Sequence, residues 1–315
     1  MRNYKYLLSS FFIAMLLILA CDPDDDSPDE INHTITVDET KIDRKVLIVG
    51  IDGFRSDVMN LTSTPFINEV IQNKNTYSNI NHITEGITYS GPNWSSILTG
   101  VHMDKHNVLN NDFDNDNYSE HPSFFHYITS ADSTKKTASI VNWIPINTYL
   151  MSDYADYAPL DYINDSEVLE HTKNLLLNDN PINSDVIFIH FDELDAIGHA
   201  HGFSGDVQEY VDKANELDSY TSELYDIIQN KRLNGEDWLF MVVSDHGGEG
   251  TSHGDANDPN INRTIFISEH PSVEFQAGCC YFSSQADIGP TVLNFLGITS
   301  TKFNESTDGV SIILN

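Results

Sequence analysis

The feature that most constrains the fold is a series of short, continuously apolar segments, each bounded by polar residues. The first covers residues 46–51 and is followed at once by Asp52 and Gly53. A strand that is buried on both faces has this pattern, because none of its side chains faces water. Similar runs occupy residues 137–143, 185–191, 238–243 and 264–267. These runs predict the strands of a mostly parallel sheet.

Helical patterns lie between several of these runs. The clearest covers residues 207–229, where Val211, Ala214, Leu217, Tyr220, Leu224 and Ile227 recur at helical spacing. Alternating strands and helices are typical of layered α/β folds, and 315 residues suffice for one large domain. We therefore expect an α/β fold, a three-layer α/β/α sandwich with a mostly parallel central sheet.

The N-terminus has the pattern of an export signal. Arg2 and Lys5 precede an apolar run over residues 6–20, which is too short to span a bilayer comfortably. The run ends in Ile-Leu-Ala-Cys and resembles the lipobox of bacterial lipoproteins; an ordinary signal peptide with an incidental cysteine is the alternative. We expect a signal peptide at 1–20, a lipidated Cys21, an acidic flexible tether at 21–43 and a folded domain at 44–315.

This arrangement predicts an exported chain that is lipid-anchored to a bacterial membrane, on the periplasmic side or at the cell surface. The formal charge of -32, from 48 acidic and 16 basic residues, argues against binding to nucleic-acid polymers. An anionic substrate would need bound cations to neutralise it. Cys279 and Cys280 are adjacent, so we expect no conventional disulfide and interpret them as small buried hydrophobic residues.

Carboxylates and imidazoles follow three of the predicted strands. Ligands of open parallel sheets bind at the carboxyl ends of the strands, where these side chains should gather. The candidates are Asp52, Asp195, His199, Asp245, His246 and His253. Read singly, Asp52 could be a turn residue and the histidines could be helix caps. Together they form two sets of three ligands suited to zinc, and three ligands leave positions open for water and substrate.

Ser90 is the candidate nucleophile. It precedes Gly91, Pro92 and Asn93, and proline is favoured in the first turn of a helix. Ser90 would then lie at a helix N-terminus, where backbone N–H groups and the helix dipole attract a phosphoryl group. A role as a helix cap is the alternative. Ser95 is a weaker candidate, because local hydrogen bonds satisfy a hydroxyl inside a helix.

An ordered set of motifs resembles the alkaline phosphatase superfamily and, within it, the type I phosphodiesterase/nucleotide pyrophosphatase group. The motifs occupy residues 50–57, 90–93, 98–100 with His106, 195–199, 244–247, 287–293 and 308–309. The resemblance extends from about Lys45 to the C-terminus. It implies an alkaline phosphatase-like catalytic domain that hydrolyses small-molecule phosphate esters.

The resemblance also implies roles for single residues. Asp195, His199 and His253 would hold one zinc ion, and Asp52, Asp245 and His246 the other. Ser90 would bridge toward the second ion and form a phosphoseryl intermediate, and Asn93 would donate to a nonbridging phosphate oxygen. His201 competes with His253 for the last ligand position.

Other activities of the superfamily remain alternatives. A sulfatase is disfavoured because its formylglycine signature has an arginine where this chain has Trp94. A phosphomonoesterase, a phosphonate hydrolase or a non-catalytic surface lipoprotein stays open. We expect diesters to be preferred, because Arg55 should pair with carboxylates rather than with substrate. Trp94 or Tyr89 could then pack against the second organic group.

Overall fold

The structure, a computed structural model, describes residues 33–60, 62–177, 183–278 and 283–314. The predicted signal peptide, Cys21, the first part of the tether, Cys279 and Cys280 lie outside these residues. Within the described ranges, no helix is both long enough and apolar enough to cross a membrane.

The described elements are as follows. The strands are β1 (Ile35–Val37), β2 (Arg44–Ile51), β3 (Thr76–Ile83), β4 (Thr137–Val141), β5 (Val186–Phe191), β6 (Asp237–Val243), β7 (Arg263–Glu269) and β8 (Ile298–Ser300). The helices are α1 (Pro65–Ile71), α2 (Ser90–Thr99), α3 (Met103–His106), α4 (Phe124–Ala131), α5 (Asp165–Leu177), α6 (Glu193–His201), α7 (Gln208–Leu233), α8 (Pro259–Asn262), α9 (Ile288–Leu296) and α10 (Thr301–Ser306). Short helical turns are η1 (Glu39–Lys41), η2 (Ser56–Val58), η3 (Ile146–Met151) and η5 (Gln285–Asp287).

Six strands form the central sheet in the order β3-β7-β6-β2-β5-β4. Strand β2 pairs in parallel with β5 and β6, and β4 pairs in parallel with β5. Strand β7 runs antiparallel to both of its neighbours. Gly50 of β2 stands opposite His190 of β5 and Val243 of β6, so these three strands end at one edge of the sheet. The predicted mostly parallel sheet is confirmed.

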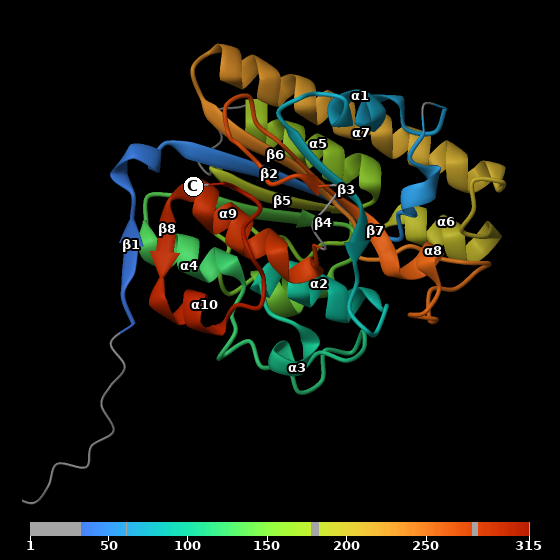
Figure 1. Cartoon of the computed structure of the whole chain (residues 1–315), viewed down its shortest axis with the longest axis horizontal. Coiled ribbons are helices and arrows are strands. Elements are labelled where there is room, and N and C mark those ends of the chain that lie inside the picture. The colour runs from blue at the N-terminus through green and yellow to red at the C-terminus, as the bar shows by residue number, and fades with distance from the viewer. Residues whose placement is uncertain (1–32, 61, 178–182, 279–282, 315) are drawn as a thin grey trace, which may run out of the picture. The chain divides into compact units, whose positions relative to one another are not determined.

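Helices cover both faces of the sheet, as Figure 1 shows for α2, α4 and α9 on one side and α1, α5 and α7 on the other. The alternation of side chains along β2 explains the two layers. Val46 and Ile48 pack into one apolar cluster, while Leu47, Val49 and Ile51 pack into the other. Because both faces are covered from Val46 onward, that part of β2 is a continuous apolar run.

The folded part begins earlier than we expected from the sequence. Strand β1 pairs antiparallel with β8, with Ile35 opposite Ser300, although residues 35–37 fall in the predicted tether. The Asp38 N–H donates to the Gly297 carbonyl, and the Asp38 side chain caps η1. The tether boundary at residue 43 is therefore corrected, because the segment from Ile35 is held by a sheet and a cap.

Candidate functional site

The carboxylates predicted as metal ligands gather at the carboxyl edge of the sheet. Asp52 directly follows β2, and its N–H donates to the carbonyl of Phe191, the last residue of β5. Asp245 follows β6 at the second position, and Asp195 lies in α6, which begins after β5. Both Asp52 and Asp245 are buried, and the side chain of Asp195 is mostly so. These side chains thus lie at the carboxyl ends of the strands, where open parallel sheets place their ligands.

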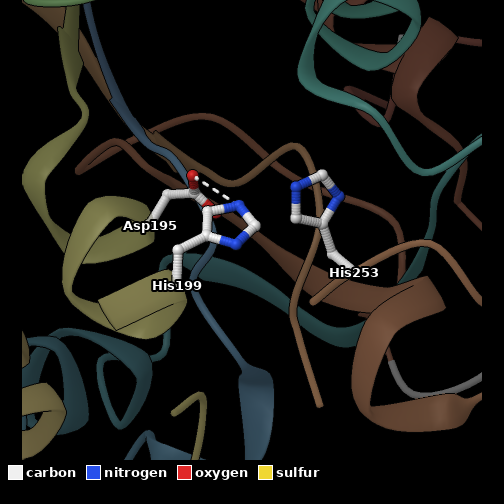
Figure 2. A group of neighbouring side chains, drawn as sticks. All are labelled: Asp195, His199 and His253. Atoms are coloured by element: carbon white, nitrogen blue, oxygen red, sulfur yellow. Dashed lines mark ion pairs between the residues drawn. The ribbon is translucent and has the colours of Figure 1, made fainter. Parts of the chain in front are cut away.

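Asp195, His199 and His253 form the first group, with ligand atoms that all lie within 4.8 Å of one another. Figure 2 shows His199 beside Asp195 and the ring of His253 across from it, and 3.4 Å separates His199 Nε2 from Asp195 Oδ2. His201 instead points to Glu209, with 3.8 Å between Nδ1 and Oε1. Of the two competing histidines, His253 is the one that the structure brings to this group.

The second group centres on His246. Its Nε2 lies 3.4 Å from Asp52 Oδ1 and 3.4 Å from Asp245 Oδ2. Asp195 also has a ligand atom within 4.8 Å of those of Asp52 and His246, so the two groups adjoin. The rings of His246 and His253 stack, with their centroids 3.9 Å apart. The structure thus brings all six predicted ligands into one cluster.

Each histidine of the cluster is held through the same ring nitrogen. The Nδ1 of His199 lies 2.9 Å from the Thr251 carbonyl oxygen, that of His246 2.7 Å from the Gly247 oxygen, and that of His253 2.7 Å from the Thr88 oxygen. A carbonyl oxygen only accepts, so each Nδ1 carries the proton. In the neutral imidazoles every Nε2 therefore has a free lone pair, which is the tautomer a metal ligand needs.

The surroundings of the three carboxyl groups do little to stabilise their charged form. Asp52 Oδ1, Asp195 Oδ1 and Asp245 Oδ2 are buried and have no hydrogen-bond partner among the described residues. Burial and the neighbouring Asp245 raise the pKa of Asp52 to about 7, and burial and Asp52 raise the pKa of Asp195 to about 6. Burial raises the pKa of Asp245 as well. Unpaired buried carboxylates beside free imidazole nitrogens fit divalent cations.

Ser90 is the first residue of α2, as the sequence predicts, and is buried. Its Oγ lies 3.4 Å from His246 Nε2, beside the second group. The other hydroxyls of this helix have partners: Ser95 donates to the Gly91 carbonyl and Thr99 to the Ser95 carbonyl. Ser90 is therefore the hydroxyl of this helix that faces the cluster.

Asn93 is bound differently from our expectation. Its amide donates to the carbonyls of Ile87 and Tyr89, and its Oδ1 accepts from the Glu85 N–H. These three bonds hold the loop before Ser90. Both amide hydrogens are engaged, so the predicted contact with a phosphate oxygen would require one of these bonds to break.

Trp94 also corrects an expectation. Its side chain is fully buried, and the indole Nε1 donates to Asp52 Oδ2 over 2.9 Å. A buried ring cannot pack against the organic group of a substrate, so Trp94 instead supports Asp52, one of the predicted ligands. Tyr89, by contrast, is 44% exposed and stands edge-on to His253, with the ring centroids 6.0 Å apart. Of the two aromatic candidates, Tyr89 has the accessible ring.

The prediction for Arg55 is confirmed. Its guanidinium makes two hydrogen bonds to Asp57 and one to Glu249, and it also donates to the carbonyls of Phe203 and Gly248. These contacts fasten the glycine-containing loop that carries His253 to the end of β2. The guanidinium is thus paired with carboxylates and carbonyls of the protein rather than left free for a substrate.

Asn111 was missed by sequence reasoning. Its Oδ1 accepts from the N–H of Gly91, the neighbour of Ser90, over 2.8 Å. The residue is exposed, and no described acceptor pairs with its Nδ2. An amide donor is thus available close to Ser90, the predicted nucleophile. No signal in the sequence separates Asn111 from the other asparagines of its polar loop.

The fold is similar to those of several solved structures. The murine ectonucleotide pyrophosphatase/phosphodiesterase 5 superimposes with a TM-score of 0.61 at 15% identity, covering 81% of this chain and 96% of that one. The C-terminal periplasmic domain of Escherichia coli EptC, in complex with zinc, gives a TM-score of 0.63 at 17% identity, with 89% of each chain covered.

Residues 46–274 match the type I phosphodiesterase / nucleotide pyrophosphatase family, and the chain belongs to that family. It is 25% identical over 288 residues to GPI ethanolamine phosphate transferase 2 of Saccharomyces cerevisiae, which covers 81% of this chain and 34% of the relative. It is 24% identical over 224 residues to bis(5'-adenosyl)-triphosphatase ENPP4 of Pongo abelii, covering 64% of this chain and 47% of the relative. The chain thus spans less than half the length of these curated relatives.

Proposed function

We propose that this chain is a phosphodiesterase or nucleotide pyrophosphatase that acts through a phosphoseryl intermediate at Ser90, with two divalent metal ions, most simply zinc. The observation that carries the proposal is the convergence of three buried carboxylates and three Nε2 lone pairs beside the Ser90 hydroxyl. Asp195, His199 and His253 would hold one ion, and Asp52, Asp245 and His246 the other. Bound divalent ions lower the pKa of a hydroxyl and neutralise phosphate oxygens.

The chain's own residues account for the covalent steps. Ser90 Oγ attacks phosphorus, its proton leaves, and the bond from phosphorus to the ester oxygen breaks as the alcohol or phosphate departs. Water then attacks the phosphoseryl group, which releases the phosphorylated product and returns the Ser90 hydroxyl. The dipole at the start of α2 favours a negatively charged phosphoryl group beside Ser90, and Tyr89 offers a ring to the organic part of the substrate.

The test is to trap the intermediate. The purified chain is incubated with a bis-aryl phosphate, quenched in acid and mapped by mass spectrometry, and a phosphate on Ser90 is expected. Ser90→Ala should lower kcat by several orders of magnitude while elemental analysis still finds about two metal ions per chain. Ser95→Ala is the matched control and should keep most of the activity. An adduct on another residue, or full activity after exhaustive chelation, refutes the proposal.

We further propose that Cys21 carries the lipid that fixes this domain to a bacterial membrane. The support is the apolar run before Cys21 and the acidic segment after it. A diacylated cysteine supplies more than one acyl chain, as stable anchoring requires. Fatty-acid labelling should mark the wild-type chain, and label retained by Cys21→Ser would exclude this site.

A further inference from the structure

His190 is a buried polar residue that the proposed chemistry does not use. It lies in β5, on the face of the sheet that packs against α2, and its side chain is fully buried. The sequence gives no reason to single it out, since it sits within an apolar run. Its Nε2 lies 3.1 Å from Asp52 Oδ2. When Asp52 is ionised, as metal binding requires, its carboxylate only accepts, so Nε2 then carries a proton and donates a hydrogen bond to Asp52.

The same carboxylate oxygen has a second donor. The indole N–H of Trp94 also bonds to Asp52 Oδ2, and the rings of Trp94 and His190 stand edge to face with their centroids 4.8 Å apart. Each ring thus limits the rotation of the other. The two donors occupy Oδ2 and leave Oδ1, the oxygen 3.4 Å from His246 Nε2, without a hydrogen bond.

The other two carboxylates of the cluster are held in other ways. Asp245 Oδ1 accepts the backbone N–H of Gly53, and Asp195 is carried by α6. Among the described residues, Asp52 is the one ligand candidate whose carboxylate accepts side-chain N–H groups from two elements of the fold. The orientation of Asp52 therefore depends on side chains that can be replaced without changing the backbone.

We propose that His190 is a positioning residue, which together with Trp94 fixes the plane of the Asp52 carboxylate so that Oδ1 alone is presented to a divalent ion. Donors behind a ligating carboxylate orient it, and they partly offset the cost of its burial. This inference rests on the proposed function, because it assumes that Asp52 is a ligand. It goes beyond the proposed function by giving a role to His190, which is not one of the six proposed ligands.

The experiment compares zinc binding by two variants of the full chain. His190→Phe keeps a ring but removes the N–H, whereas His190→Gln keeps an N–H that reaches the position of Nε2. Calorimetric titration of metal-free protein should show about two zinc equivalents for the wild type. His190→Phe should weaken one equivalent by about 10- to 100-fold and leave the other unchanged. His190→Gln should bind both within about threefold of the wild type, a rescue that marks the N–H as the cause.

A matched control separates this effect from the loss of any buried histidine. His270 is also buried and bonds through Nε2 to the carboxylate of Asp237. Asp237, however, is the first residue of β6 and so lies at the end of that strand away from the cluster. His270→Phe should leave both zinc affinities unchanged. Circular dichroism and melting of the metal-free chains check that each variant folds. If His190→Phe does not fold, His190→Asn replaces it, because its shorter amide stops near the position of Nδ1.

Each other outcome has a distinct meaning. Wild-type zinc affinity in His190→Phe, or in His190→Asn where it replaces the Phe variant, overturns the inference while the proposed function stands. Equally weak zinc binding by His190→Gln and His190→Phe also overturns it. If the wild type binds a third zinc equivalent that every His190 variant lacks, His190 is itself a ligand, and the inference is also overturned. A wild-type chain that binds no divalent ion would refute the metal sites of the proposed function.

Discussion

Asn93 and Asn111 both lie close to Ser90, but their hydrogen bonds indicate different roles. The Asn93 amide is fully buried and bonds to three backbone groups of the loop before Ser90. Asn111 uses only Oδ1, on the Gly91 N–H, and keeps Nδ2 for an acceptor from outside. A sequence motif cannot make this distinction, because it records which residues are near one another and not which of their atoms are already bonded.

Asn111→Ala should therefore impair the reaction rather than the fold. Removal of one donor to a transition-state oxygen costs about 10²- to 10³-fold in rate, and we expect a fall of that size in kcat/KM. The melting temperature should change little, because the residue is exposed. Asn110→Ala is the control, since its Oδ1 only caps the local turn at Asp112. Steady-state kinetics with a bis-aryl phosphate measure both, and equal activities for the two variants would contradict the role of Asn111.

The three strands that carry the site were predictable, but its supporting groups were not. Strands β2, β5 and β6 are buried on both faces, so their apolar runs mark them, and the polar residues that follow indicate the candidate ligands. Strand β3 was missed because it lies at the edge and exposes part of its length, which breaks the apolar run. His190 was missed because its proposed role depends on contacts with a neighbouring strand and helix. The sequence of one segment does not show which other segments it will contact.

Asp52, at the end of β2, also makes the stability of the metal-free protein depend on pH. The pKa of Asp52 is raised to about 7, against about 3.9 in the unfolded chain. Between these values the folded state holds the proton and the unfolded state has lost it. The free energy of unfolding then falls as pH rises through this window. Buried histidines act in the opposite sense, because burial lowers the pKa of His82 to about 4.

A comparison with Asp52→Asn separates the two effects, since the amide does not titrate and the histidines are common to both chains. In metal-free protein the stability of the wild type relative to Asp52→Asn should fall as pH rises from about 4 to about 7. Zinc added at the upper end should raise the melting temperature of the wild type and release protons, because ions replace protons on the carboxylates. Thermal melts across this range provide the measurement. A constant difference between the two chains would contradict it.

At the scale of the whole molecule, the balance of charge limits which ester can react. The formal charge is -32, and Arg55, three residues after the predicted ligand Asp52, is committed to Asp57 and Glu249. In the proposed mechanism, bound ions supply the positive charge that faces the phosphate oxygens. A monoester brings a dianion, and efficient monoesterases usually add an arginine or a further cation to their metals. A diester carries one negative charge and a second organic group, which the exposed ring of Tyr89 can contact.

We therefore expect diesters to react faster than monoesters, and sulfate esters to react slowest. The measurement is kcat/KM for a bis-aryl phosphate, an aryl phosphate and an aryl sulfate on one preparation. Tyr89→Ala should reduce the rate with the diester more than with the monoester, because only the diester has a second group for the ring to contact. A monoester preference of tenfold or more, about 1.4 kcal/mol in transition-state binding, would replace the phosphodiesterase by a phosphatase.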